Sequence, residues 1–178
     1  EQVVSDDDIL TGMVEDLDTG FIDLVRVHQP GIYSGAYRLL RNRQDAEDVA
    51  QDTFARAYRA LEGYDAGRIR ALRLRGWLWT IALNLCRTHG SRPVPVAVDI
   101  RDDDLSHRDG DPFDTDHWNV LLARLSDDQR TAVVLRHVVD LPIADIALIT
   151  DRPEGTVKAD ISRGLQRLRS SIDTEATQ

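Results

Sequence analysis

Residues 45–61 of the chain, DAEDVAQDTFARAYRAL, contain apolar side chains at intervals of three and four positions. These side chains are Ala46, Val49, Ala50, Phe54, Ala57, Tyr58 and Leu61. The spacing places them on one face of an α-helix and leaves the polar side chains on the opposite face. Asp45 is the expected N-cap, because its carboxylate can accept hydrogen bonds from free amide groups of the first turn. The segment therefore predicts an amphipathic helix that buries one face against other helices.

The same helical periodicity continues on both sides of this segment. Residues 6–16, 21–40 and 73–89 also repeat apolar side chains every three or four positions. Pro30 and Gly31 are expected to break or kink the helix over residues 21–40, because proline cannot donate the helical hydrogen bond. No segment shows a convincing strand pattern. The sequence therefore predicts an all-α fold.

Three helical segments near the C-terminus predict a helix-turn-helix. Ser126 and Gln129 form a capping box that opens a helix to about Val138. A short helix follows Pro142, and a longer one begins at about Glu154 after a tight turn. This order is typical of a DNA-binding helix-turn-helix, although an ordinary helical hairpin gives the same pattern. The outer face of the last helix is expected to carry Thr156, Lys158, Asp160, Ser162, Arg163 and Arg167.

Composition divides the chain into three parts. The 178 residues carry a net charge of −9, and this length suits one ordinary domain or two small ones. Residues 93–116 are rich in aspartate and proline, and so predict an acidic linker between a domain over residues 1–92 and another over residues 117–178. No apolar run is long enough for a membrane helix, so we expect a cytoplasmic protein. Cys86, the single cysteine, excludes an internal disulfide and is expected to be buried.

A stretch without acidic residues separates Asp65 from Asp99, although the protein as a whole is acidic. Arginine can form two hydrogen bonds with a phosphate and can stack on a base, and tryptophan offers a flat face to an unpaired base. The stretch therefore indicates a surface for nucleic acid, and the alternative is a solvated helix with a chance run of arginine. Its arginines and tryptophans are Arg68, Arg70, Arg73, Arg75, Trp77, Trp79, Arg87 and Arg92.

Three motifs resemble those of bacterial RNA polymerase sigma factors of the extracytoplasmic-function (ECF) group. Residues 45–54 resemble region 2.2, and residues 77–84, with Trp77-Leu78, Ile81-Ala82 and Asn84, resemble regions 2.3 and 2.4. Residues 125–130 and 155–158 resemble region 4. The motifs occur in the family's order and span nearly the whole chain. The resemblance implies a region 2 bundle and a region 4 helix-turn-helix, joined by the acidic linker.

The resemblance also implies which residues make contacts. Core polymerase would bind the acidic and amide face formed by Glu47, Asp48, Gln51 and Asp52. The minus-thirty-five element would be contacted by Arg152, Thr156, Lys158 and Arg163. Trp77 lies on the apolar stripe and is expected in the core, so Trp79 is the expected stacking residue. The complete minus-ten set would be Arg68, Arg70, Arg73, Arg75, Trp79, Asn84, Arg87 and Arg92.

The implied function is that of an alternative sigma factor. It would bind core RNA polymerase, recognise and melt promoter DNA, start transcription and be controlled by an anti-sigma factor. The sequence shows no catalytic motif and no paired histidine spacing for a metal, so we expect no enzyme, cofactor or metal site.

Asp160 stands where the family usually has arginine, and this favours an alternative: a sigma-like decoy that binds an anti-sigma factor or polymerase without opening promoters. A free-standing helix-turn-helix repressor is a further alternative. On the expected groove-facing side, Asp160 would repel phosphate, so Asp160→Arg is expected to strengthen duplex binding.

Overall fold

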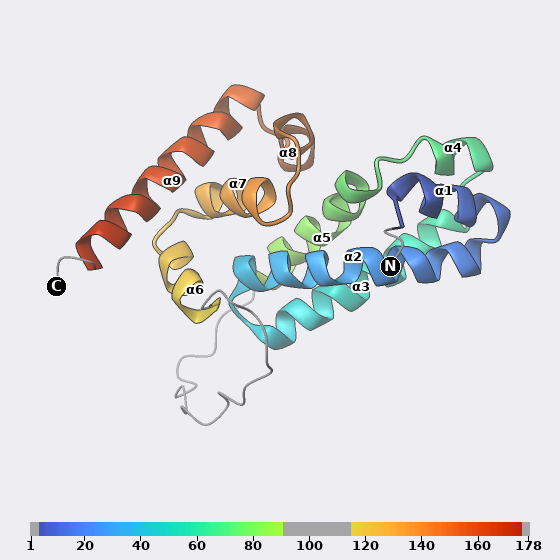
Figure 1. The fold of residues 1–178 in the computed structure, drawn as a ribbon, viewed down its shortest axis with the longest axis horizontal. Helices are drawn as coiled ribbons and strands as arrows, with labels where there is room; N and C mark the ends of the chain where they lie inside the picture. The colour runs from blue at the N-terminus through green and yellow to red at the C-terminus, as the bar shows by residue number, and fades with distance from the viewer. Residues whose placement is uncertain (1–3, 91–114, 176–178) are drawn as a thin grey trace.

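The computed structural model describes residues 4–90 and 115–175, and these residues form helices and turns with no strand. Figure 1 shows two groups of helices, α1 to α5 and α6 to α9. The all-α prediction with two helical units is confirmed. The helices are α1 (Asp6–Glu15), α2 (Leu17–Leu40), α3 (Arg43–Leu61), α4 (Ala66–Arg70), α5 (Leu74–Gly90), α6 (Thr115–Ala123), α7 (Asp127–His137), α8 (Ile143–Thr150) and α9 (Glu154–Glu175).

The first unit is built around α2, which packs against α1, α3 and α5. Gly20 allows α1 and α2 to meet closely, since a Cβ there would lie 2.3 Å from the backbone nitrogen of Met13. The expected break at Pro30 is wrong, because α2 continues through it. Pro30 itself is exposed, and buried side chains such as Leu24 and Ile32 hold the helix on both sides of it. The missing hydrogen bond therefore does not end the helix.

The helix over residues 45–61 begins earlier than its apolar pattern suggests. α3 starts at Arg43, and its N-cap is Asn42, whose side chain accepts a hydrogen bond from the Asp45 amide at 3.1 Å. The prediction that Asp45 caps this helix is therefore wrong. Asp45 lies within the first turn, where its negative charge suits the helix dipole.

The second unit packs α7, α8 and α9 around Leu135, Leu141, Ile146 and Val157. Ser126 caps α7 by accepting a hydrogen bond from the Gln129 amide, but Gln129 Oε1 makes no return bond, so only half of the predicted capping box is present. A Cβ on Gly164 of α9 would lie 2.7 Å from Val133 of α7, so glycine permits the close crossing of these helices. α6 starts at Thr115, within the predicted linker, and residues 91–114 of that linker lie outside the described residues.

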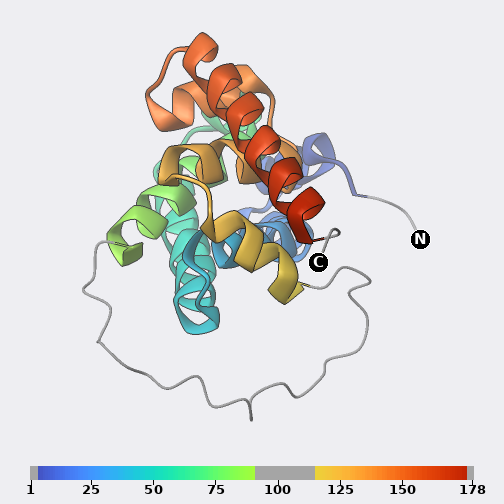
Figure 2. The ribbon, with the colours of Figure 1, turned by 90° about the vertical axis from the view of Figure 1, so that its left-hand side faces the viewer.

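The two units lie against each other, with α7 and α8 beside α2 and α5 (Figures 1 and 2). Val139, in the turn between α7 and α8, is buried at this junction beside Gly35 and Trp79. Arg130 of α7 donates a hydrogen bond to the backbone carbonyl of Leu39 at 3.5 Å. The junction is therefore formed by apolar packing with polar contacts at its edge.

Candidate nucleic-acid and polymerase interfaces

Four arginines on α4 and at the start of α5 form the arginine row: Arg68, Arg70, Arg73 and Arg75. All four are exposed. Asp65 caps α4 by accepting a hydrogen bond from the Arg68 amide at 2.8 Å, and so fixes the turn that precedes the row. Arg73 has an acidic partner on the other unit, because its Nη1 lies 2.7 Å from Asp145 Oδ1.

An aromatic cluster adjoins the arginine row and consists of Tyr64, Arg68 and Trp77. The Arg68 guanidinium lies 3.7 Å from the centre of the Tyr64 ring, at cation–π distance. The Tyr64 and Trp77 rings lie 6.1 Å apart at an interplanar angle of 54°. Trp77 is half-buried and packs against the hydrophobic core.

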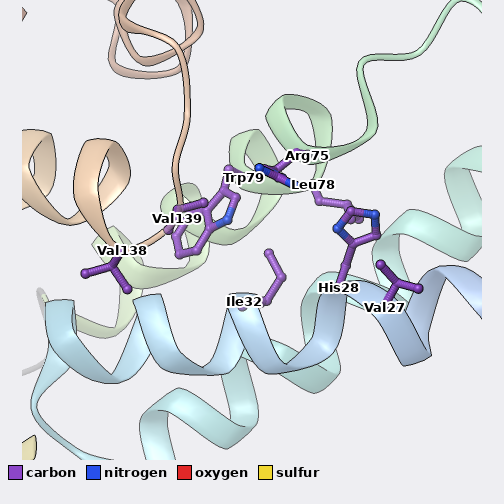
Figure 3. A pocket seen from close by; sticks show the side chains of 9 residues that line it. Val27, His28, Ile32, Arg75, Leu78, Trp79, Val138 and Val139 are labelled. Atoms are coloured by element: carbon purple, nitrogen blue, oxygen red, sulfur yellow. The ribbon is translucent and has the colours of Figure 1, made fainter. Parts of the chain in front are cut away.

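Of the two tryptophans, Trp77 packs against the hydrophobic core as expected, whereas Trp79 is more deeply buried than expected. Trp79 is only 1% exposed, and its ring packs so closely on α2 that a Cβ at Gly35 would lie 2.5 Å from it (Figure 3). In this conformation Trp79 has no free face for a base, which contradicts its expected stacking role for as long as the two units lie together. The physical reason is that the second unit covers α5 through Val139, which buries a side of the helix that one apolar stripe did not predict.

The spacing along α5 contains a signal for this orientation. Buried residues Gly76, Trp79, Leu83 and Cys86 are three, four and three positions apart and follow one side of the helix. An accessible line follows another side, at intervals of four, three, four and three positions. Its residues are Arg73, Trp77, Thr80, Asn84 and Arg87. The structure therefore places Trp77 with the predicted minus-ten residues Arg73, Asn84 and Arg87, whereas Arg92 lies outside the described residues.

The predicted polymerase-binding residues lie on the outer side of α3. Glu47, Gln51 and Asp52 are exposed. Asp48 is half-buried and accepts a hydrogen bond from Gln44 Nε2 at 3.1 Å. Three carboxylates thus lie close together on one exposed helix face and give it a negative charge suited to a basic partner.

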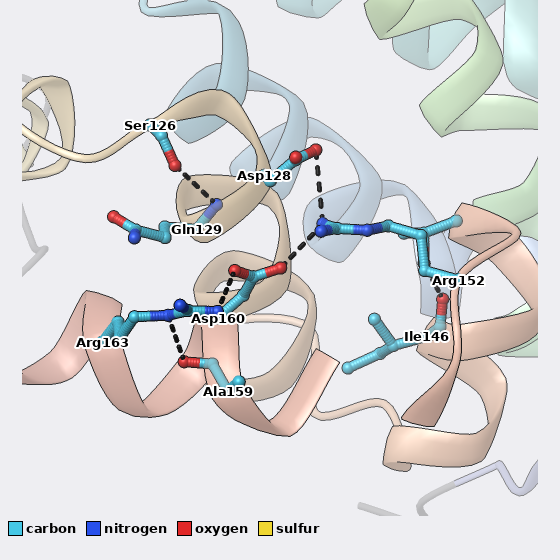
Figure 4. Close-up of polar contacts among 9 residues, drawn as sticks. Ser126, Asp128, Gln129, Ile146, Arg152, Ala159, Asp160 and Arg163 are labelled. Atoms are coloured by element: carbon cyan, nitrogen blue, oxygen red, sulfur yellow. Dashed lines mark hydrogen bonds and ion pairs between the residues drawn. The ribbon is translucent and has the colours of Figure 1, made fainter. Parts of the chain in front are cut away.

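The predicted minus-thirty-five residues differ in exposure and in their polar contacts, and Figure 4 shows those of Arg152 and Arg163. The side chains of Lys158 and Arg163 are each 60% exposed. Thr156 is half-buried. Arg152 is held from two sides, because its Nη1 lies 2.7 Å from Asp160 Oδ2 and 3.3 Å from Asp128 Oδ1. Lys158 and Arg163 each have one acidic neighbour on α9, Glu154 at 3.8 Å and Asp160 at 3.5 Å, but stay largely exposed, whereas Arg152 is more enclosed.

Asp160 faces the interior of the second unit, which corrects its expected place on the outer face of the last helix. Its residue is 6% exposed, and its carboxylate contacts Arg152 and, at 3.5 Å, Arg163 Nη2 (Figure 4). The sequence contained a signal for this position, because Asp160 shares a helical line with buried Val157, Gly164 and Leu168. An aspartate here joins α9 to the preceding turn, and no repulsion of DNA by this residue is implied.

Burial changes the chemistry of several polar groups. It raises the pKa of the Cys86 thiol to about 12, so this side chain is a buried neutral group, as predicted. Burial also lowers the pKa of Arg130 beside Leu39.

Within residues 4–90 and 115–175, no group of three histidine, cysteine or acidic residues could hold a metal ion. Among the same residues, none of the helices combines the length and apolar character needed to cross a membrane.

Comparison with solved structures shows the fold. The chain resembles CnrH, solved in complex with the cytosolic domain of CnrY, with a TM-score of 0.73 and 23% identity over 96% of this chain and 99% of that one. It also resembles the sigma factor RpoE of Bartonella quintana, solved in complex with the anti-sigma factor NepR, with a TM-score of 0.67 and 23% identity. That match covers 90% of this chain and 98% of the other.

Sequence comparison gives the family. The sigma-70 region 2 model matches residues 24–92, and the sigma-70 region 4 model matches residues 119–168. The ECF RNA polymerase sigma factor SigW of Bacillus subtilis is 30% identical over 171 residues, covering 85% of this chain and 88% of SigW. SigE of Mycolicibacterium smegmatis is 31% identical over 166 residues, covering 88% of this chain and 63% of SigE. The chain therefore belongs to the ECF group of RNA polymerase sigma factors.

Proposed function

We propose that this ECF sigma factor opens its promoter by holding the melted minus-ten strand along the accessible line of α5. The observation that carries the proposal is the alignment of Arg73, Trp77, Asn84 and Arg87 on one side of that helix. Arginines can pair with phosphates along the strand, while Trp77 and Tyr64 offer ring faces to unpaired bases. Residues 1–92 would form the region 2 domain, residues 93–116 the linker and residues 117–178 the region 4 domain.

Melting requires that bases leave the stack, which costs a few kcal/mol per step. Stacking on an aromatic ring contributes roughly 1–3 kcal/mol per base, so one captured base offsets much of that cost. The aromatic cluster is well suited to this task, because Arg68 already lies over the Tyr64 ring and Trp77 is beside it. Trp77, in place of Trp79, is thus the proposed stacking residue.

Recognition of duplex DNA is assigned to the start of α9. Lys158 and Arg163 are exposed and would contact guanine edges or phosphates in the major groove, with Thr156 beside them. Arg152 would act mainly by positioning, since Asp128 and Asp160 hold its guanidinium. The inward position of Asp160 removes the observation that favoured the sigma-like decoy.

Core polymerase would bind the acidic face of α3, and the chain would act in the cytoplasm as a non-enzymatic initiation factor. We also propose control by an anti-sigma factor, since CnrH and the Bartonella RpoE, which share this fold, were solved with CnrY and the anti-sigma factor NepR, respectively. Such a partner would cover the surfaces proposed for DNA and polymerase.

Run-off transcription with purified core polymerase tests the proposal. The chain should direct a discrete transcript from its own promoter, and permanganate should detect unpaired thymines near minus ten. A chain that binds core polymerase without producing a transcript or reactive thymines would be a decoy. A chain that shifts duplex DNA strongly in the absence of polymerase would be a repressor.

A further inference from the structure

The contact between Arg73 and Asp145 joins a proposed DNA-binding residue to the opposite unit. We propose that, in the free protein, the Asp145 carboxylate occupies the place of a promoter-strand phosphate on α5. The closed arrangement of the two units and the binding of the promoter strand would then exclude each other. This inference rests on the proposed place of Arg73 in the minus-ten surface.

The surroundings of the Asp145 carboxylate are suited to a phosphate. One oxygen lies 2.7 Å from Arg73 Nη1. The other oxygen lies 3.5 Å from the position that a Cβ would take on Gly76, in the first turn of α5. At this distance a Cβ would be in ordinary van der Waals contact, so the carboxylate lies beside the first turn of this 17-residue helix, whose N-terminus carries positive charge. The Arg73 guanidinium already holds one anionic group beside the first turn of a helix, and a DNA phosphate is likewise an anionic hydrogen-bond acceptor.

Docking of the two units explains why Asp145 is buried. The residue lies in the first turn of the short helix α8 and is only 7% exposed. α8 packs on α5, and Arg73 at the start of α5 contacts this carboxylate, with Gly76 in the first turn close by. Separation of the units would therefore expose the Asp145 carboxylate and the Arg73 guanidinium together.

Other contacts hold the closed arrangement. The Arg73 side chain is 66% exposed, and ion pairs so open to water add little stability. Apolar packing of Val139 beside Trp79 and Gly35 is buried and supplies the main attraction between the units. The Asp145 carboxylate therefore acts mainly by competing with DNA for Arg73, and it adds little to the affinity between the two units. Opening becomes a population shift that polymerase or promoter DNA can drive.

The test compares Asp145→Asn with Asp140→Asn in the full chain. Asp140 is exposed in the same unit and has a positive φ of 60°, which asparagine also adopts readily, so the control makes the same charge change without the α5 contact. Binding is measured by fluorescence anisotropy with a labelled single-stranded DNA of about 12 nucleotides, a length that can cover such a surface.

If Asp145 competes with DNA for Arg73, the Asp145→Asn variant, and not Asp140→Asn, should gain affinity for the single-stranded DNA. Asp145→Asn should bind this DNA about threefold to tenfold more tightly than the wild type, because Arg73 becomes available for one more phosphate contact. The dependence of log affinity on log salt should become steeper by about 0.7 for that contact. Asp140→Asn should remain within about twofold of the wild type. Equal affinities of the two variants would overturn the proposal.

Arg73→Ala separates failure of this inference from failure of the proposed function. The gain from Asp145→Asn should disappear in the Arg73→Ala background, because both changes act on the same contact. If Arg73→Ala weakens binding but Asp145→Asn brings no gain, only the competition is wrong. If Arg73→Ala changes the affinity for single-stranded DNA in neither background, Arg73 does not belong to the minus-ten surface. That result would overturn the competition proposal and remove Arg73 from the proposed function.

Val139→Ser provides a second route to the open state without a change in charge. It removes apolar packing at the junction and lies far in sequence from the proposed DNA contacts, so it should also raise affinity for the single strand. Circular dichroism checks that each variant retains its helical content. If Asp145→Asn is unfolded, Val139→Ser decides, and a folded Val139→Ser protein without a gain would overturn the proposal.

Discussion

At the scale of the residue, Trp77 and Trp79 have different environments although only two positions separate them. Trp79 is buried between α2 and the turn after α7, while Trp77 is half-buried beside Tyr64. Removal of the two rings should therefore have different consequences. The Trp79 ring contributes to the packing between the units, and the Trp77 ring is the one proposed to stack on a base.

Replacement of each tryptophan by alanine should affect a different property, the free energy of unfolding for Trp79 and promoter opening for Trp77. Trp79→Ala should lower the free energy of unfolding by about 3–5 kcal/mol, because it leaves a large cavity at a well-packed position. Trp77→Ala should retain most of the stability and lose promoter opening. Urea unfolding and permanganate reactivity measure the two effects. Normal opening by a folded Trp77→Ala protein would contradict the stacking role.

Asp160 has a structural role, and this reverses the expected effect of replacing it by arginine. Asp160→Arg would place a second guanidinium against Arg152 in a buried site and should destabilise the second unit by about 3 kcal/mol or more. Duplex binding should become weaker as a result. Ser162→Arg, on the exposed side of the same helix, is the control, since it adds one positive charge without disturbing that contact. Thermal unfolding and footprinting of upstream DNA compare them, and a stable Asp160→Arg protein would contradict this role.

At the scale of the element, α4 and α5 act together because the Asp65 cap fixes the turn before the arginine row. Replacement of Arg68, Arg70, Arg73 and Arg75 by alanine should abolish the open complex, since the melted strand loses its charged partners. Core binding should persist, because α3 is unchanged. Permanganate reactivity and co-purification with core polymerase measure the two properties. Unchanged reactivity at the promoter would exclude these arginines from strand capture.

The exposed face of α3 gives the complementary prediction. Glu47→Lys together with Asp52→Lys should weaken core binding several-fold, because the negative face then repels a basic partner. The fold should persist, since both residues are exposed and lie opposite the apolar face. Affinity for core polymerase is the measurement, with thermal unfolding as the control. Unchanged affinity would place the polymerase contact elsewhere.

At the scale of the whole molecule, the junction between the units contains a cavity of about 210 Å³ with both apolar and charged walls (Figure 3). Val138 and Val139 line it from the second unit, while Val27, Ile32 and Trp79 line it from the first. His28 and Arg75 are also part of the lining. His28 is therefore a buried histidine at the junction, and its protonation is expected to change the stability of the closed arrangement.

The pH dependence follows from His28. Burial lowers its pKa, Asp6 at 3.0 Å opposes this shift and Arg75 adds to it. The folded state thus binds the proton less readily than the unfolded state, whose pKa is about 6.5. Stability is therefore greatest above pH 6.5 and decreases as the pH falls through the lower pKa of the folded state.

Replacement of His28 measures this contribution. His28→Gln should reduce the fall in melting temperature between about pH 7 and pH 5, because the glutamine cannot take up a proton. His137→Gln, at an exposed position, serves as the control and should leave the fall unchanged. Identical pH profiles for the His28→Gln protein and the wild type would contradict the assignment.

The sequence alone determined the helices and their order, because three-and-four periodicity and capping depend on residues close together in the chain. Residues 45–61, the cap at Ser126 and the helix-turn-helix were predictable in this way. The spacing along α5 and α9 allowed more than one buried side, and only the tertiary structure decided which side is covered and which charges are paired. The second unit covers Trp79, Asp145 meets Arg73, and Asp160 holds Arg152. Each of these facts depends on contacts between helices, which local periodicity does not specify.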